Sequence, residues 1–458
     1  MGPTLYRARW VLPIDGPPIA DGAVGVDGTD LVWVGPASKG RRHRRWPRIV
    51  DLEDAVLTPG LVNAHSHLEL TAFRGLLEDL PFTRWLRELV RLKYQVLTPG
   101  DFVDAATWGC LEALRAGVTT VGDTGDSGAT VAALSRTGLR GVFYQEVFGP
   151  DRAEADGAVV RLARKVRALA SRASPTIRVG VSPHAVYTVS DRLFQLVQRY
   201  AARDGLDVAI HISESRDEVE LIRDGTGELA RTQVARGLPC PPRGTTPIRH
   251  LEDLGALHGG PLLIHAVQAT DEELDLIALR GARVAHCPRS NAKLGHGSAP
   301  LAGLLSRGVA VGLGSDSVAS NNSMDLIGEA REAALVARSR ERRADAVPAP
   351  TAVDLATRGG ARALRWDREI GSLRAGMRAD LSAFSMTGAH WSPAAPPEVG
   401  LVFSGSGLDA VLTVVAGEEL HVKGSFPRFS EEEVAALRKR ISKLSERLAR
   451  ARRTQIHA

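Results

Sequence analysis

The chain has 458 residues, of which 44% are hydrophobic and 24% are charged, a balance typical of soluble globular proteins. No apolar stretch approaches the ~20 residues of a membrane-spanning helix, and the first residues lack the basic and then apolar pattern of a signal peptide. Three isolated cysteines, Cys110, Cys240 and Cys287, indicate reduced thiols. These features argue against a membrane protein and predict a cytoplasmic one.

The basic sequence pI of about 9.3 comes from one segment rather than from the whole chain. Residues 423–458 carry ten Lys or Arg and four Glu, a net charge of +6, so residues 1–422 carry −1 of the total of +5. From residue 430 onward the pattern predicts a basic amphipathic helix, whose apolar face is formed by Val434, Leu437, Ile441, Leu444 and Leu448. We expect this helix to pack on the protein body or on a partner subunit of a homodimer. Nucleic-acid binding, which would weaken steeply with salt and be lost on deletion of residues 430–458, is the less favoured interpretation.

Short β-type runs occur at both ends of the chain. In residues 1–56 they are separated by Gly, Pro and Asp turns, and similar runs return after residue 374. We therefore expect residues 1–56 and 375–422 to form one small β-sandwich domain, followed by the basic C-terminal helix over residues 423–458.

Residues 57–374 alternate apolar strands with amphipathic helical segments. The expected strands are 56–65, 117–124, 140–148, 177–184, 207–213, 261–267, 282–288 and 309–316. Helical patterns between them include 101–115, 191–203 and 271–280, the last opened by a capping box at Thr270. Eight such units predict an α/β fold, a (β/α)8 TIM barrel. A doubly wound open sheet is the alternative, but no Gly-x-Gly-x-x-Gly turn follows an early strand.

Polar residues recur where the predicted strands end, which is where barrels of this class build their active sites. These residues are His65, His67, Glu146, His184, His211, His265 and Asp316. A single histidine in such a position is more often a packing residue, but histidines ending four strands indicate a metal centre. Three imidazoles and a carboxylate can hold one divalent ion, zinc or alternatively iron, with a position left for water. The ion lowers the pKa of that water, and Glu214 could move protons to the leaving group.

Several motifs together resemble the amidohydrolase superfamily, in its branch of mononuclear aminohydrolases and chlorohydrolases acting on nitrogen heterocycles. They are residues 59–67 (PGLVNAHSH), 182–184 (SPH), 211–214 (HISE), 264–266 (IHA), 286–291 (HCPRSN), 314–317 (GSDS) and 371–381 (GSLRAGMRADL). The resemblance extends to about residue 422 and does not include the final basic helix.

The resemblance implies a role for each matching residue. Metal ligands are implied at His65, His67, His211 and Asp316. His265 is implied to contact the metal-bound water, Glu214 to carry a proton to the ring nitrogen, and Asp316 to help deprotonate the water. Two-metal relatives use a carboxylated lysine on a middle strand, and strands 140–148 and 177–184 contain no lysine, so one metal ion is expected.

Hydrolytic deamination is the reaction that this resemblance implies. Residues 67–70, 82–86, 145–149 and 315–321 are most similar to aminodeoxyfutalosine deaminases of the alternative menaquinone route. Deaminases of S-adenosylhomocysteine or other adenosine-type compounds, and a chlorohydrolase or amidase acting on another heterocycle, remain alternatives. In each case the expected partner is a small molecule.

Five residues are expected to contact the substrate. Glu69 could accept hydrogen bonds from ribose hydroxyls, and Arg74 and Trp85, placed in the loop after the first strand, could meet an acidic group and the face of the base. His184 and Glu146 complete the set. The sequence His67-Leu68-Glu69 also matches the His-x-Glu of cytidine-deaminase-type zinc enzymes, but Pro239-Cys240 lacks the second cysteine that this class requires.

Overall fold

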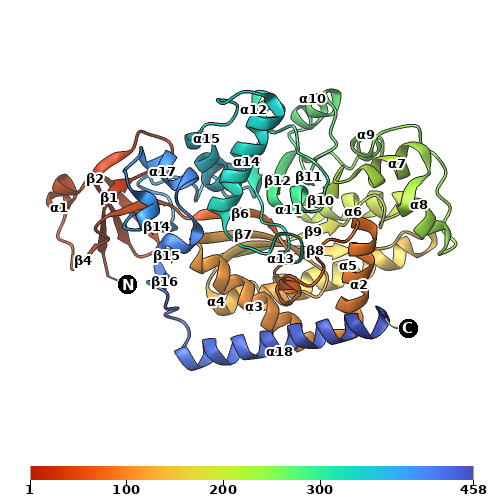
Figure 1. The fold of residues 1–458 in the computed structure, drawn as a ribbon, viewed down its shortest axis with the longest axis horizontal. Helices are drawn as coiled ribbons and strands as arrows, with labels where there is room; N and C mark the ends of the chain where they lie inside the picture. The colour runs from red at the N-terminus through yellow and green to blue at the C-terminus, as the bar shows by residue number, and fades with distance from the viewer. Residues whose placement is uncertain (1, 457–458) are drawn as a thin grey trace.

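The structure is a computed structural model that describes residues 2–456. Both ends of the chain pair in one eight-stranded sheet, at the left of Figure 1. Its strands follow the order β16 (Glu418–Val422), β15 (Ala410–Val415), β14 (Leu381–Ser385), β5 (Ala55–Pro59), β1 (Thr4–Val11), β2 (Ile19–Asp27) and β3 (Asp30–Pro36), with β4 (Arg48–Asp51) beside β1. The two ends therefore meet as expected, but these strands form a single sheet, and a sandwich of two sheets is not among the described pairings.

The predicted strand 56–65 is wrong as a single strand, because the chain divides at Gly60. β5 pairs antiparallel with β14, whereas β6 (Leu61–Ser66) pairs parallel with β7 (Val118–Gly125). Pro59 has no backbone N–H for continued pairing, and a Cβ at Gly60 would clash with the Thr119 side chain. The Pro-Gly step thus passes the chain from the end sheet into the central sheets.

The eight central strands form two parallel sheets of four. One has the order β6, β7, β8 (Arg140–Val147) and β9 (Ile177–Pro183), and the other β10 (Ala209–Ile212), β11 (Leu262–His265), β12 (Arg283–His286) and β13 (Val311–Leu313). Isolated parallel bridges join them at both seams, Ser66 with Asp316 and Val181 with Val208. The strand order is the predicted one, but the described pairing is not one continuously closed barrel.

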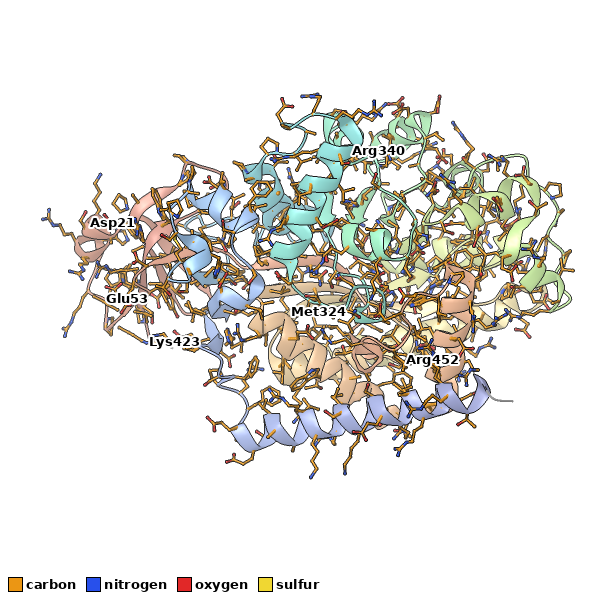
Figure 2. All side chains as sticks on the ribbon, in the orientation of Figure 1. Asp21, Glu53, Met324, Arg340, Lys423 and Arg452 are labelled. Atoms are coloured by element: carbon orange, nitrogen blue, oxygen red, sulfur yellow. The ribbon has the colours of Figure 1, made fainter. Side chains whose placement is uncertain are left out.

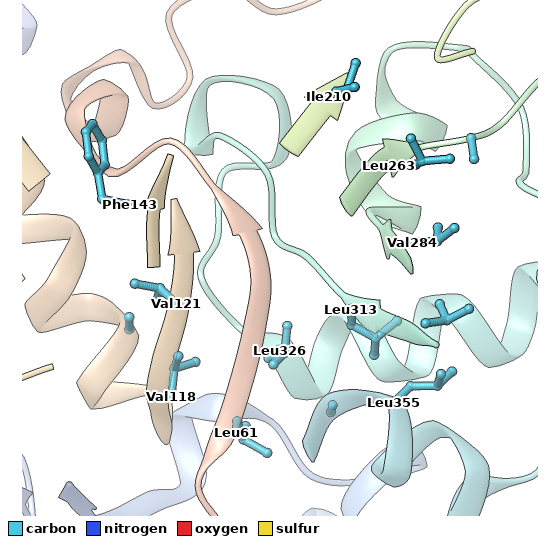
Figure 3. Packing of buried hydrophobic residues seen from close by; sticks show 14 of the residues in the cluster. Leu61, Val118, Val121, Phe143, Ile210, Leu263, Val284, Leu313, Leu326 and Leu355 are labelled. Carbon is cyan, nitrogen blue, oxygen red and sulfur yellow. The ribbon is translucent and has the colours of Figure 1, made fainter. Parts of the chain in front are cut away.

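The residues of the eight central strands are buried except Arg178 and Val179 of β9, which explains why these strands are rich in apolar residues. Alternate residues enter different clusters: Ile210, Leu263 and Val284 pack with the surrounding helices, whereas Ala209 and Ile264 join the enclosed cluster. Figure 3 shows part of the first cluster around these strands.

Helices surround these sheets and are connected to them by mostly short turns. They are α1 (Ala37–His43), α2 (Phe82–Val96), α3 (Pro99–Arg115), α4 (Ala129–Thr137), α5 (Ala155–Ala170), α6 (Asp191–Asp204), α7 (Arg216–Asp224), α8 (Gly227–Val234), α9 (Pro247–Asp253), α10 (Asp271–Leu279), α11 (Pro288–Lys293), α12 (Leu301–Ser306), α13 (Val318–Asn321), α14 (Leu326–Glu341), α15 (Ala349–Asp354), α16 (Gly360–Ala363), α17 (Pro397–Phe403) and α18 (Glu431–Ile456). A 3-10 helix, η1 (Leu68–Phe73), follows β6. The capping box at Thr270 is confirmed, because Thr270 and Glu273 exchange hydrogen bonds between side chain and backbone.

The basic helix α18 runs along one side of the molecule, below α3 in Figure 1. Leu437, Leu444 and Leu448 are buried, and the helix packs on α2, α3 and η1 of its own chain. Arg452, which is labelled in Figure 2, donates a hydrogen bond to the carbonyl of Leu76 and so ties the end of α18 to the body. The predicted apolar face is therefore covered by the protein itself. No helix in residues 2–456 combines the length and apolarity needed to span a bilayer.

Candidate active site

Four histidines and an aspartate from four strands converge at one end of the central sheets. His65 is the next-to-last residue of β6 and His67 follows the strand, while His211 lies on β10, His265 ends β11 and Asp316 follows β13. Each side chain is at least four-fifths buried. The structure therefore brings together the residues that the strand-end pattern singled out.

The distances within this group are short enough for shared binding of one ion. His65 Nε2 and His67 Nε2 lie 3.3 Å and 3.5 Å from Asp316 Oδ1. The imidazole nitrogens of His65, His67 and His211 that could act as ligands all lie within 4.8 Å of one another. His265 is close by, with its ring centre 5.8 Å from that of His65.

Contacts across the seam between β6 and β13 hold this arrangement. The Asp316 backbone N–H donates to the His65 carbonyl at 3.0 Å, and the Asn63 side chain exchanges hydrogen bonds with Ser315 at 2.7 Å and 2.9 Å. Asp316 itself has a left-handed backbone with φ of 54°, and His265 has φ of 77°. Such conformations cost energy in non-glycine residues and are typical of functional sites, where the surrounding structure enforces them.

Hydrogen bonds to the far sides of these groups orient them. His67 Nδ1 lies 3.0 Å from the Thr124 carbonyl, which fixes it as the protonated nitrogen and leaves Nε2 with a lone pair. His265 Nδ1 lies 2.9 Å from Asn291 Oδ1. Asp316 Oδ2 accepts a hydrogen bond of 2.6 Å from the Ser290 hydroxyl, so its other oxygen, Oδ1, faces the histidines.

The donor set fits a divalent metal ion. Among the described residues, His65 Nε2 and His211 Nδ1 are buried nitrogens without a hydrogen-bond partner. Burial lowers the pKa of His65, and it lowers the pKa of His67 and His211 well below the ordinary value, so all three are neutral imidazoles at pH 7. Neutral imidazole is the form that binds zinc.

Glu214 stands beside this centre, at the turn after β10. The backbone N–H groups of Ser213 and Glu214 each donate to the Glu218 carboxylate at 2.9 Å, which fixes the turn. Burial acts to raise the pKa of Glu214, but His265 and His296 outweigh it and the pKa lies below its ordinary value. The Glu214 carboxyl is therefore ionised at neutral pH, the state in which it can accept a proton.

A cavity opens above these residues. Its lining comprises His67, Leu70, Phe82, Trp85, Leu86, Leu89, His184, Tyr187, His211, Glu214, His265, Leu294, Asp316 and Ser317. Trp85 and His184 are thus placed where a substrate would contact them. The expectation that Trp85 lies in a loop is wrong, because it lies on α2. The apolar face of α2, with Phe82, Trp85 and Leu89 spaced by three and four residues, was the signal for this wall of the cavity.

The other expected substrate contacts are not part of this lining. Glu69 is fully buried and accepts hydrogen bonds from Lys93 and Ser127, so its carboxylate is already bound within the protein. Arg74 points away from the cavity to Glu112 and the carbonyl of Asn322. The geometry gives neither residue a substrate contact.

Glu146 lies behind His184 rather than in the cavity lining. Its Oε1 is buried without a hydrogen-bond partner among the described residues and lies 4.0 Å from His184 Nε2. Burial raises the pKa of Glu146 well above its ordinary value. A direct contact between Glu146 and a substrate therefore stays a prediction.

Comparison with known proteins places this geometry in a family. Residues 56–420 match the model of the amidohydrolase family, and the chain belongs to that family. It is 39% identical to a protein of Nitratidesulfovibrio vulgaris (strain DSM 19637 / Miyazaki F) named 5-methylthioadenosine/S-adenosylhomocysteine deaminase, over 90% of each chain. A protein of the same name from Moorella thermoacetica is 34% identical over 97% of this chain and 100% of its own.

Solved structures of similar proteins include a zinc-bound adenosine deaminase from Xanthomonas campestris, with a TM-score of 0.87, 30% identity and coverage of 97% of this chain and 98% of the other. The zinc complex of the atrazine chlorohydrolase TrzN from Arthrobacter aurescens TC1 has a TM-score of 0.82, 25% identity and coverage of 96% and 100%. The family and its deaminase-named members make this chain a hydrolase acting on carbon–nitrogen bonds.

Proposed function

We propose that this enzyme deaminates an adenosine-type nucleoside by hydrolysis, releasing the 6-amino group as ammonia. The observation that carries the proposal is the position of Glu214, a buried ionised carboxylate that lines a cavity together with His67, His211 and Asp316. The names of the similar deaminases support the same reaction.

One divalent metal ion, zinc or alternatively iron, would be held by His65, His67, His211 and Asp316. When bound, it would lower the pKa of a water molecule and so make hydroxide available at neutral pH. Two observations support this set of ligands. His65 and His211 each have a buried nitrogen without a hydrogen-bond partner among the described residues, and the Ser290 hydroxyl holds Asp316 Oδ2 so that Oδ1 faces the histidines.

The residues of the chain would then move protons and hold the base. Glu214 takes a proton from the attacking water and delivers it to the ring nitrogen next to the carbon under attack. A carbon–oxygen bond forms and the carbon–nitrogen bond to the amino group breaks. Of the two protons of the water, one stays on the ring nitrogen, and the other passes through Asp316 to the amino group, which leaves as ammonia. His265, whose Nε2 lies 3.6 Å from Glu214 Oε1, orients the carboxylate.

The residues that line the cavity indicate which 5′ substituent of the nucleoside the enzyme would accept. Four leucines and three aromatic residues line it, and none of its lining residues is Arg or Lys. Such a wall favours a neutral, apolar 5′ substituent, because a charged group would lose its water without gaining a partner. A 5′-thioether such as 5′-methylthioadenosine is therefore the first candidate, in agreement with the names of the relatives.

Aminodeoxyfutalosine, which would place the enzyme in menaquinone biosynthesis, is the second candidate. It is supported by the similarity of residues 67–70, 82–86, 145–149 and 315–321 to deaminases of that compound. Its carboxylate would have to reach beyond the apolar lining to solvent or to a basic group.

A substrate panel tests the proposal. Purified enzyme, with its metal content measured, is incubated with adenosine, 5′-methylthioadenosine, S-adenosylhomocysteine, aminodeoxyfutalosine and atrazine. We expect ammonia release and the ultraviolet change of adenine to hypoxanthine for at least one nucleoside. Chloride release from atrazine without any nucleoside turnover would replace the proposal with a chlorohydrolase.

A further inference from the structure

A second histidine faces the catalytic carboxylate, and it comes from a segment outside the strand ends. His296 Nε2 lies 3.4 Å from Glu214 Oε1, on the same oxygen that faces His265 at 3.6 Å. His296 Nε2 is a buried nitrogen without a hydrogen-bond partner of favourable geometry among the described residues, and the Glu214 carboxylate is the acidic group that faces it. The Glu214 carboxylate therefore lies between two imidazoles.

The turn after α11 is built to direct His296 inward. Gly295 and Gly297 on either side have φ of 73° and 96°, conformations that glycine adopts without strain. The His296 backbone N–H donates to the Asn291 carbonyl at 2.9 Å, and its own carbonyl accepts from Gln268 Nε2 at 2.7 Å. Both backbone groups are thus satisfied while the side chain is only 4% exposed.

The His296 ring also touches the wall of the cavity. Its centre lies 4.7 Å from that of Phe82 in an edge-to-face arrangement, with an interplanar angle of 85°. Phe82 begins α2 and lines the cavity. His296 therefore lies between Phe82, on the apolar wall that would contact the purine ring, and Glu214, which would protonate that ring.

We propose that His296 is a positioning residue, which donates a hydrogen bond from Nε2 to Glu214 Oε1 and so presents Glu214 Oε2 to the reacting atoms. This inference rests on the proposed function, because it deepens the role of Glu214. In the proton transfer, Oε2 gains the proton of the water and then passes it to the ring nitrogen. The His296 proton stays on its own nitrogen, so His296 is unchanged at the end of the reaction.

The test compares His296→Leu, which removes the donor, with His296→Gln, which keeps an N–H group at a similar reach. His250→Leu is the matched control. His250 lies on α9 outside the cavity lining, is similarly buried, and its Nε2 atom pairs with Asp191 Oδ1 at 3.0 Å. With 5′-methylthioadenosine or the best substrate of the panel, we expect His296→Leu to lower kcat at least ~10-fold with KM nearly unchanged. His296→Gln should recover most of this loss, and His250→Leu should keep its kcat.

A double-variant comparison separates positioning from general damage. If His296 acts through Glu214, adding His296→Leu to Glu214→Gln should change the residual rate by less than about threefold, because residues acting as a unit are non-additive. A full further loss in that background, or an unchanged kcat in His296→Leu, would overturn the inference.

A crystal structure of zinc-loaded His296→Leu supplies a readout that needs no substrate. We expect Glu214 to turn away from His265 in this variant and to keep its position in His296→Gln. A Glu214 carboxylate that stays in place in both variants would overturn the inference, even if the wild-type enzyme deaminates adenosines. Failure of the wild type on every nucleoside would instead overturn the proposed function alone.

Discussion

Lys93 Nζ lies 2.6 Å from Glu69 Oε1, and the two side chains are only 9% and 0% exposed. Glu69 belongs to η1, directly after His67, whereas Lys93 lies near the end of α2, the helix whose other end lines the cavity. Lys93 also donates a hydrogen bond to a second carboxylate, that of Asp126. Burial acts to lower the pKa of Lys93, but Glu69 and Asp126 outweigh it and raise the pKa well above its ordinary value. This ion pair connects the cavity wall to the segment that follows His65 and His67.

Breaking this pair on one side should destabilise the protein strongly. Lys93→Met leaves Glu69 buried without its cation, and removing one partner of a buried pair costs about 3–5 kcal/mol. We expect the free energy of unfolding in urea to fall by roughly that amount.

The double variant Lys93→Met/Glu69→Gln serves as its control. Because it removes both charges, it should recover part of the loss. Equal destabilisation of the single and the double variant would show that the charge pairing is not the cause.

Glu214→Gln should lower turnover strongly and leave the fold intact. The amide cannot accept and release the proton, and general acid–base groups contribute about 10²–10⁴-fold to rate. We expect kcat to fall within that range while the midpoint of thermal unfolding stays near that of the wild type. Glu220→Gln, six residues further along the chain on α7, is the comparison and should retain wild-type kcat.

Metal removal should abolish activity and lower stability together. A ligand that binds only the folded state stabilises it by about 4 kcal/mol at a thousandfold excess over its Kd. We expect dialysis against a chelator to stop ammonia release and lower the unfolding midpoint, and added zinc to restore both. His65→Ala should neither bind the metal nor respond to the chelator. Full turnover by metal-free protein would contradict the assigned site.

Asp191 should make stability depend on pH in the acid range. Partial burial acts to raise its pKa, but hydrogen bonds from His250 and Arg243 outweigh this and lower it from 3.8 to about 2. Because the folded-state pKa lies below the unfolded one, the stabilisation is present above pH 3.8 and is lost as pH falls towards 2.

Asp191→Asn tests this expectation through the free energy of unfolding. The variant should be less stable than the wild type at pH 6, and the difference should shrink as pH falls below about 4. A difference that is constant with pH would assign the effect of Asp191 to packing rather than to its charge.

The strand order and the convergence of the candidate metal ligands could be predicted because their signals are local. Apolar runs ended by His65, His211 and His265 carry both the strand and its functional end in a few consecutive residues. The prediction of one strand over residues 56–65 was wrong at Gly60, because an apolar run cannot show that the chain passes from one sheet to another there. The sequence also could not show that the two sheets are joined only by isolated bridges among the described residues, because pairing at the seams is between strands far apart in the chain.

The substrate contacts were harder, because they depend on tertiary partners. The sequence places Glu69 next to His67, where it could contact a substrate, but it does not show that Lys93 on α2 donates a hydrogen bond to the Glu69 carboxylate. His296 carried no strand-end signal, and only the fold brings it to Glu214. The Gly295-His296-Gly297 turn was the one local hint that the side chain has a directed position.

The packing of α18 has a consequence for how the enzyme is made. Leu444 and Leu448 belong to the same buried cluster as Phe82, Trp85 and Leu92 on α2. During synthesis on the ribosome, α2 emerges long before Leu444 and Leu448, and its outer apolar side stays uncovered until these leucines have been made. Nascent chains that lack α18 should therefore expose this apolar surface and be prone to aggregation.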